Sequence, residues 1–377
     1  MVVLVGMGEK MAERFLPIYV LALGGTNVVI GLLNGMDNLL SALYSFPGGY
    51  LSDRLGTKRA LILFNLLAMG GFLIVILFPQ WQAVLVGAVF FLSWTAISLP
   101  ATMGMVSAVL PRNKRTMGVS MHSLVRRIPM ALGPVLGGLI IARYGTREGV
   151  RLAFVASLAL AAVALLLQQR LIREPAREAR PAEPSPFRML GQMSPSLRIL
   201  LVADILVRFC EQIPYAFVVI WAITLHGITP VQFGILTTVE MVTAMLVYVP
   251  VAYLADRSHK KPFVVTTFGF FTLFPLVLLF SRSFWPMALA FVVRGLKEFG
   301  EPTRKALIMD LAPEGRKAGM FGAYYLARDV LVSVAAFGGA FLWNASPATN
   351  LLVAFGFGAL GTLWYGLLGR DLAEASQ

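Results

Sequence analysis

The chain has few charged residues, few histidines and one cysteine. Only 14% of its 377 residues are charged and 58% are hydrophobic, whereas soluble globular proteins carry about 25% charged and about 45–50% apolar residues. A single cysteine, Cys210, excludes an intramolecular disulfide, and three unclustered histidines predict no metal site. A soluble core of this composition would leave too much apolar surface in water, so the sequence predicts an all-α membrane protein without a cofactor.

The charge that is present is strongly unbalanced, with 32 Lys and Arg against 19 Asp and Glu and a net charge of +13. A basic chain raises the question of nucleic acid, but the basic residues form no blocks with interleaved aromatic residues, and we therefore expect no nucleic-acid partner. They lie instead in short loops between apolar stretches, where the positive-inside rule places them. The partner that this charge indicates is a lipid bilayer.

Twelve apolar stretches are long enough to cross a membrane, since about 20 apolar residues span its hydrocarbon core. They lie at residues 2–24, 29–51, 60–79, 82–109, 117–142, 152–169, 199–223, 232–254, 263–281, 286–311, 319–344 and 348–369. One long polar segment, rich in arginine and proline, separates the first six from the last six. We predict a six-helix bundle at 1–169, a cytoplasmic linker at 170–198 and a second six-helix bundle at 199–377.

The distribution of basic residues predicts the orientation. Loops after the second, fourth, sixth, eighth and tenth spans carry Lys or Arg, whereas those after the first, third, seventh and eleventh carry none. This bias predicts a multi-pass protein of the inner (cytoplasmic) membrane with both termini in the cytoplasm. The loop after the fifth span, with Arg143, Arg147 and Arg151, disagrees and is outweighed by the others.

A short loop sequence occurs twice, with an offset of 203. It reads GYLSDRLGTKR at residues 49–59 and AYLADRSHKK at residues 252–261. At the same offset, Asp37 in the second span falls on Glu240 in the eighth; at an offset of 201, Arg127 falls on Arg328. The pair Gly137-Gly138 falls on Gly338-Gly339 at that second offset. Repeated segments of this kind predict two parallel copies of one bundle around a central cavity.

On these features the whole chain resembles the major facilitator superfamily. Residues 49–59 are similar to the loop between its helices 2 and 3, and residues 256–261 are similar to the degenerate copy between helices 8 and 9. The segment Gly133-Pro134-Val135-Leu136-Gly137-Gly138 resembles the helix-5 motif of the family's drug and metabolite antiporters, although Pro129 replaces a glycine of the longer motif. The resemblance implies two pseudosymmetric six-helix bundles that rock about a central site.

The repeated loops predict a latch between the bundles. Basic loop residues can pair with carboxylates or with the C-termini of helices; the alternative is that these charges only hold the loops in the cytoplasm. The predicted gating residues are Gly49, Asp53, Arg54, Gly56, Lys58, Arg59, Asp256 and Arg257. In the helix-5 segment, Gly133, Gly137 and Gly138 are expected to permit close helix packing, and Pro134 is a candidate hinge.

Charged residues inside the predicted spans are informative, because one at mid-bilayer costs at least about 2.5–3.5 kcal/mol. On the seventh span, Arg208 can reach Asp204 and Glu211 at helical spacing. Lys297 is predicted to add a partner for Glu301, and Pro302 to kink the tenth span. The candidates for solute binding or proton coupling are Glu9, Glu13, Arg14, Asp37, Arg126, Arg127, Arg208, Glu211, Glu240, Glu298, Glu301 and Arg328.

These charges have two alternative roles. Most are expected to form ion pairs that fix helix packing, since buried charges are generally paired. Arg126 and Arg127 have no acid on their own span, and Arg328 has only the adjacent Asp329, which helical spacing directs elsewhere. Arg127 and Arg328 are therefore predicted either to clamp an anionic group of the solute or to act as counter-ions for span carboxylates such as Glu9.

The sequence thus predicts a secondary transporter, not an enzyme. It contains no phosphate-cradling loop for ATP-driven transport and no nucleophile–base set near a membrane face. We expect a monomer that moves a small solute in a cycle coupled to protons, with anions as one candidate class of solute. The segment at Gly133 to Gly138 favours export. Uptake of a nutrient or organic anion shares every feature above. A membrane sensor on the same fold would need a soluble domain, which the linker is too short to supply.

Overall fold

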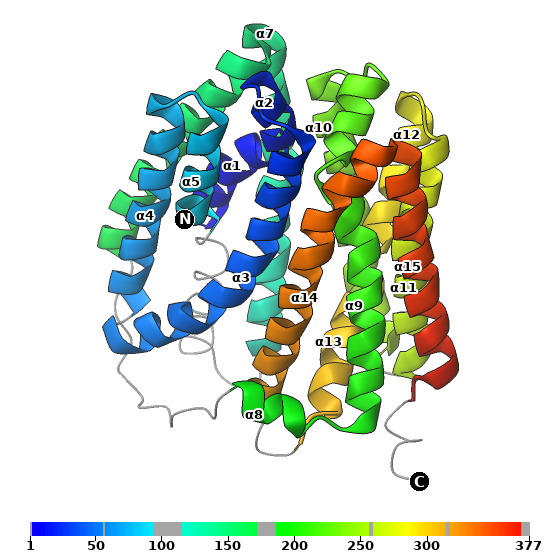
Figure 1. Ribbon diagram of the computed structural model, residues 1–377. Coiled ribbons are helices and arrows are strands. Elements are labelled where there is room, and N and C mark those ends of the chain that lie inside the picture. The colour runs from blue at the N-terminus through cyan, green and yellow to red at the C-terminus, as the bar shows by residue number, and fades with distance from the viewer. Residues whose placement is uncertain are drawn as a thin grey trace. The chain divides into compact units, whose positions relative to one another are not determined.

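The computed structural model describes residues 2–55, 57–92, 115–171, 186–255, 259–313 and 317–370, whose regular secondary structure is helical throughout (Figure 1). The helices of the N-terminal half are α1 (Val2–Glu13), α2 (Leu16–Ala22), α3 (Asn27–Leu55), α4 (Thr57–Leu77), α5 (Trp81–Phe91) and α7 (Arg115–Leu171). Those of the C-terminal half are α8 (Pro186–Gly191), α9 (Pro195–Tyr215), the π-helix η2 (Ile220–Leu225), α10 (Pro230–Ala255), α11 (Lys260–Phe280), α12 (Phe284–Leu296), α13 (Glu301–Asp310), α14 (Lys317–Ala345) and α15 (Pro347–Leu368).

Within these residues, each of the twelve predicted spans contains helix. Six helices are long and apolar enough to cross a membrane: Lys58–Leu77, Val125–Arg170, Pro230–Tyr248, Lys260–Phe280, Met320–Ala345 and Pro347–Leu368. The second of these is two successive helices, because the chain leaves helical geometry at Gly145 (φ 77°, ψ 168°), a conformation that glycine adopts at little cost. Its two parts correspond to the fifth and sixth predicted spans.

Among the residues that the structure describes, three predicted spans are interrupted rather than continuous. The first breaks between α1 and α2, the seventh between α9 and η2, and the tenth between α12 and α13. The kink predicted at Pro302 is confirmed as a break: the helix stops at Leu296 and restarts at Glu301, with Pro302 in the first turn, where a missing N–H costs no hydrogen bond. The amide of Gly300 donates instead to the Thr267 hydroxyl. The interruptions leave five segments of 6 to 13 residues that are too short to span a membrane alone, namely α1, α2, η2, α12 and α13.

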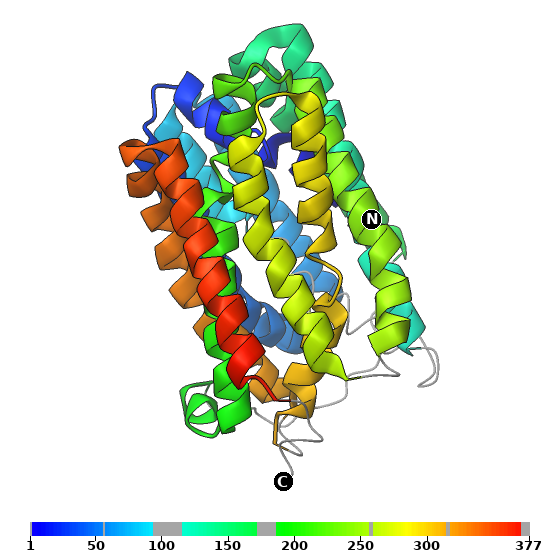
Figure 2. The same cartoon turned by 90° about the vertical axis from the view of Figure 1, so that its right-hand side faces the viewer.

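The chain forms two compact units. The first unit comprises residues 1–179 with 219–238, and the second comprises residues 180–218 with 239–377. In the first unit α1 packs against α7, and α4 packs against α5 and α7. In the second unit α9 packs against α14 and α15, and α11 packs against α15. In Figure 1 the green α9 runs between the orange α14 and the red α15, and Figure 2 shows α14 and α15 side by side.

Large apolar side chains cover the outside of both units. Phe280, Trp285 and Leu367 are among the exposed ones, each at least 75% exposed. A soluble protein rarely carries contiguous apolar surface of this kind, whereas a lipid-facing helix requires it. The buried core of the second unit contains aromatic residues such as Phe268 and Phe271, packed against α9 residues such as Val207.

Close helix contacts inside each unit establish the register of the internal repeat. A Cβ atom added at Gly137 would overlap the carbonyl of Met11, and one added at Gly339 would overlap the carbonyl of Ile213. Gly338, in contrast, has open space beside it. The structural counterpart of Gly137 is therefore Gly339, at an offset of 202 and not the predicted 201.

The ends of two helices agree with this register, because α1 ends at Glu13 and α9 ends at Tyr215, again 202 residues later. The equivalence predicted between Arg127 and Arg328 is thereby corrected by one residue. The counterpart of Arg328 is Arg126. A shift of one residue matters, because it turns a side chain about 100° around the helix axis.

Candidate functional site

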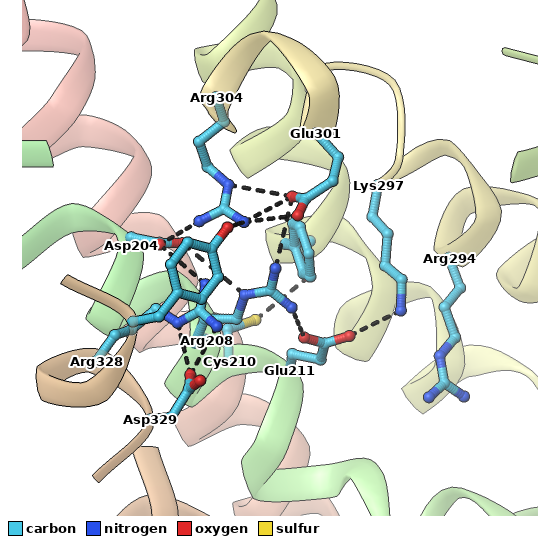
Figure 3. Close-up of polar contacts among 12 residues, drawn as sticks. Asp204, Arg208, Cys210, Glu211, Arg294, Lys297, Glu301, Arg304, Arg328 and Asp329 are labelled. Carbon is cyan, nitrogen blue, oxygen red and sulfur yellow. Dashed lines mark hydrogen bonds and ion pairs between the residues drawn. The ribbon is translucent and has the colours of Figure 1, made fainter. Parts of the chain in front are cut away.

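A network of charged side chains lies in the core of the second unit (Figure 3). It is built by one face of α9, by the broken helix formed by α12 and α13, and by residues of α10 and α14. The α9 residues are spaced four and three apart and therefore lie on one helix face. The members are Asp204, Arg208 and Glu211 of α9, Glu240 of α10, Arg294 of α12, Lys297 directly after it, Glu301, Arg304 and Lys305 of α13, and Arg328 and Asp329 of α14.

Asp204 is the centre of one half of this network. Its carboxylate accepts hydrogen bonds from the Arg304 guanidinium, from the Tyr324 hydroxyl at 3.2 Å and from Arg328 Nη1 at 3.3 Å. The side chains of Asp204 and Arg304 are each 1% exposed. Charges buried to this extent need such partners, because an unpaired ion would lose its solvation without compensation.

Arg304 also binds a second carboxylate. Its Nη2 atom donates to both oxygens of Glu301, at 2.7 and 2.8 Å, and its Nε atom donates to Oε2 at 3.1 Å. Sequence reasoning missed Arg304, although its position three residues after Glu301 on one helix was a usable signal. The helix break before Glu301 turns α13 relative to α12, so a stripe drawn along one continuous helix did not include it.

Glu211 joins the two ends of the network. It accepts from Arg208 Nη1 at 2.6 Å and from Lys297 Nζ at 2.7 Å. The prediction that Arg208 pairs with Asp204 and Glu211 is confirmed, since its Nε atom lies 3.8 Å from Asp204 Oδ1. The prediction that Lys297 pairs with Glu301 is wrong: Lys297 turns toward Glu211 and lies 3.4 Å from Glu240.

Arg294 occupies an aromatic environment at the far end of the network. Its guanidinium lies 5.3 Å from the ring centroid of Tyr215, 4.9 Å from that of Phe274 and 5.6 Å from that of Phe291. Its Nε atom lies 3.3 Å from Glu240 Oε1. Ring faces and one carboxylate together stabilise a cation that is almost fully removed from solvent.

Arg328 is fully engaged inside the second unit. Besides Asp204 it binds Asp329, with its Nε and Nη2 atoms both 2.7 Å from Oδ1, and its guanidinium lies 4.1 Å from the Tyr325 ring. The expectation that Asp329 is directed away from Arg328 is therefore wrong. Glu298 lies in the turn between α12 and α13 and is partly exposed.

The first unit carries a smaller charged group on α1. Lys10 Nζ donates to Glu9 Oε1 at 3.2 Å and also binds the carboxylate of Glu13. Arg14 follows directly after α1. The α1 carboxylates thus share one lysine, in contrast to the arginine-rich network of the second unit.

Asp37 lies on α3 beside this group. The charged side chains near it are Glu13, Lys10, Glu9 and Arg14. Across the ranges that the structure describes, no hydrogen bond or ion pair reaches the Asp37 carboxylate. It differs in this from Glu240 on α10, the residue that the sequence aligns with it at an offset of 203, which lies within ion-pair distance of Arg294 and Lys297.

Arg126 and Arg127 lie near α1, on α7. The charged groups near Arg126 are Glu9 and Arg127. Gly133 brings the two helices close together, since a Cβ atom there would lie 2.8 Å from the Cβ of Lys10. Gly137 and Gly138 are also buried in close contacts, so the helix-5 glycines permit close packing as predicted.

The gating residues are described only in part. Lys58 Nζ donates to the Gln169 carbonyl in the last turn of α7 at 2.7 Å. In the second copy of the loop, Lys260 forms an ion pair with Asp310 of α13. Arg59 is exposed. The backbone of Gly49, Asp53 and Arg54 belongs to α3, and their side chains, like all of Gly56, Asp256 and Arg257, lie outside the described residues.

Two units of apolar helices, repeated in one chain and containing paired charges, define a multi-pass membrane transporter. The chain belongs to the Major Facilitator Superfamily, whose family model matches residues 1–223 and 199–376. The predicted family and fold class are thus confirmed. Members of this family are secondary transporters and not enzymes.

Solved transporter structures match almost the whole chain. A POT family transporter in complex with 5-aminolevulinic acid superposes with a TM-score of 0.78 at 12% identity, covering 98% of this chain and 95% of that chain. A variant of the nucleoside transporter NupG gives 0.78 at 12% identity, covering 97% and 98%. The peptide transporter POT in complex with sulfate gives 0.75 at 15% identity, covering 100% and 93%. At these identities the likeness establishes the fold alone.

Curated relatives match a shorter stretch. The chain is 30% identical over 151 residues to the multidrug resistance protein MdtG of Rahnella sp. (strain Y9602), and equally so to that of Escherichia fergusonii. The match covers 38% of this chain and 36% of each relative, so it spans about a third of their length.

Proposed function

We propose that this transporter exports a small solute in exchange for protons across the inner membrane. The observation that carries the proposal is the contrast between the charged groups of the two units. The carboxylates of the second unit are bound by several cations, whereas Asp37 in the first unit lies beside other carboxylates without an ion pair among the described residues.

Proton coupling requires a carboxylate that binds and releases a proton during the cycle. A carboxylate bound by two or more cations is committed to ion pairs that hold its helices together, and breaking such a buried pair is costly. Asp204, Glu211 and Glu301 are of this kind, each having at least two basic partners. They serve as structural ion pairs, and Asp37 is the coupling residue, with Glu9 and Glu13 as its neighbours.

Two similarities support export. The matched relatives are named multidrug resistance proteins, and Gly133 to Gly138 resemble the helix-5 motif of antiporters. In the structure Gly133 and Gly137 hold α7 against α1, the helix that carries Glu9 and Glu13. A movement of α7 would therefore act directly on the environment of the α1 carboxylates.

Reconstituted liposomes test the proposal. The purified protein is placed in vesicles loaded with a pH-sensitive dye, and a cation (ethidium), an anion (phenylphosphonate) or a neutral sugar (sucrose) is added. At least one of these three solutes should cause proton movement across the membrane. Protein-free vesicles are the control. Solute uptake without proton movement would contradict the coupling. Everted membrane vesicles test direction, since accumulation only in right-side-out vesicles would replace export by uptake.

The proposed orientation places both termini in the cytoplasm, and the single cysteine makes it testable. Cys210 is buried, so a Cys210→Ala protein offers a background for single exposed cysteines. An impermeant maleimide should label Thr26→Cys in intact cells and Arg59→Cys only after permeabilisation. Thr26 directly precedes α3, whereas Arg59 lies in the first turn of α4, beyond the other end of α3. The reverse labelling pattern would invert the orientation.

Uptake of an organic anion is a second candidate function. Two adjacent arginines, Arg126 and Arg127, lie on α7 near α1, and the charged groups around Arg126 include a single carboxylate, Glu9. Arginine forks bind carboxylate and phosphate groups well. Transport of phenylphosphonate in right-side-out vesicles alone would favour this candidate over export.

A further inference from the structure

Two arginines at equivalent positions of the two units have different numbers of carboxylate partners. At the offset of 202 that the helix contacts establish, Arg328 on α14 corresponds to Arg126 on α7. Two carboxylates neutralise Arg328, namely Asp204 at 3.3 Å and Asp329 at 2.7 Å. The positions of the first unit that are equivalent to Asp204 and Asp329 are not acidic residues.

Asp204 corresponds to position 2, which is a valine, and Asp329 corresponds to Arg127. The second unit therefore surrounds its arginine with negative charge, whereas the first unit replaces one carboxylate by an apolar residue and the other by a cation. Over the described residues, Arg126 forms no hydrogen bond or ion pair. The one carboxylate near it, Glu9, already accepts from Lys10 at 3.2 Å.

The charge balance of the first unit agrees with this difference. The first six predicted spans contain four cations, Lys10, Arg14, Arg126 and Arg127, and three acids, Glu9, Glu13 and Asp37. Protonation of one acid would increase the excess of positive charge. Uncompensated charge at membrane depth is costly, so an additional anion is the natural complement.

We propose that Arg126 binds an oxyanion group of the transported solute, in the role that Asp204 and Asp329 play toward Arg328. The group is a carboxylate, phosphate or phosphonate, which matches the planar donor fork of arginine. Arg127 points in a different direction, because adjacent residues on a helix do not share a face. It therefore contributes to the site only through its positive charge. This site replaces the clamp predicted between Arg127 and Arg328, because Arg328 is already neutralised. The inference rests on the proposed function, since it names the class of its solute.

The test measures ligand binding to the purified full-length protein at fixed ionic strength. Benzoate and phenylphosphonate are compared with uncharged benzamide, and apparent affinity is obtained from the concentration dependence of thermal unfolding. Both anions should stabilise the wild type more than benzamide does. Arg126→Gln should weaken anion binding roughly tenfold or more, the size expected for the loss of a charge-assisted hydrogen bond.

Two further variants make the test specific. Arg127→Asp recreates in the first unit the arginine–aspartate pair of Arg328 and Asp329, and should abolish anion binding by supplying an internal counter-ion. Arg143→Gln removes an exposed arginine of the same helix and should leave anion binding unchanged. Arg126→Lys should retain part of the affinity, because the charge remains and the fork is lost.

The outcomes separate this inference from the proposed function. Equal stabilisation of the wild type and of Arg126→Gln by both anions would overturn the inference while leaving transport intact. Binding that is lost in Arg126→Gln and Arg127→Asp but kept in Arg143→Gln would support it. If none of the three solutes moves protons in the liposome assay, the proposed function is refuted, whatever the result of the binding assay.

Discussion

Asp204 and Arg304 lie 100 positions apart in the sequence and form a buried ion pair that joins α9 to α13. Because Arg304 also holds Glu301, this single guanidinium neutralises two carboxylates of the second unit. The pair fixes the second segment of the broken helix against α9, and thereby positions the remainder of the network.

Arg304→Ala should lower stability strongly. The substitution leaves Asp204 without its closest cation and removes the bidentate partner of Glu301, and loss of one member of a buried pair costs about 3–5 kcal/mol. The measurement is thermal unfolding in detergent. Lys305→Ala is the control, because Lys305 is 46% exposed although it lies 3.3 Å from Glu301, and its loss should cost less than about 1 kcal/mol. Equal losses for the two variants would show that the network does not stabilise the unit.

Gly339→Ala should destabilise the second unit, whereas Gly338→Ala should not. A Cβ atom at Gly339 would overlap the Ile213 carbonyl, while no atom lies within 4 Å of one at Gly338. Overpacking of this kind costs about 1–3 kcal/mol. The same assay compares the two adjacent variants, and a larger effect at Gly338 would contradict the register of 202.

Asp37→Asn should uncouple transport from protons. An amide cannot carry a proton through the cycle, so proton-driven accumulation of solute should be lost while downhill exchange of labelled solute continues. Little stability should be lost, because none of the described residues forms an ion pair with Asp37. Dye-loaded liposomes and counterflow measure the two activities.

Glu211→Gln is the comparison for this prediction. Glu211 accepts from both Arg208 and Lys297, so its neutralisation should lower the unfolding temperature. Retained stability with lost coupling in Glu211→Gln, together with normal coupling in Asp37→Asn, would move the proton site to the second unit.

Lys58→Ala should slow transport more than it lowers stability, if the loop after α3 gates the cycle. The lost contact is one hydrogen bond to the last turn of α7, and a cation at a helix C-terminus contributes about 0.3–1 kcal/mol. The neighbouring Arg59→Ala is the matched variant at an exposed position. Transport per folded molecule that equals the wild type in Lys58→Ala would leave this lysine with only an anchoring role.

Much of the fold could be predicted because membrane helices are specified locally. A run of apolar residues long enough for the bilayer forms a helix whatever its neighbours are, since every backbone group must be satisfied within the segment. The break near Pro302 was predictable for the same reason, because proline lacks the amide that a continuous helix requires. Arg208 with its two α9 carboxylates was also predictable, because helical spacing alone brings them together.

The partners of Lys297, Arg304 and Arg328 could not be predicted in this way. Lys297 binds a residue 86 positions away and Arg304 one 100 positions away, and such pairs depend on which helices adjoin and how each is rotated. The break before Glu301 changes that rotation, so the pattern of one straight helix assigned Lys297 to the wrong carboxylate. Arg328 binds the adjacent Asp329, whereas helical spacing predicts contacts only between residues three or four positions apart.

The sequence by itself determined the membrane class, the paired bundles and the presence of charges inside the spans, since composition and length act through the solvent that surrounds each helix. Only the tertiary structure decided the register of 202 and the choice of ion-pair partners. A single residue of register turns a side chain about 100° around its helix, and close glycine contacts are the features that fix that rotation. They place Arg126, rather than Arg127, in the position that Arg328 holds in the other unit.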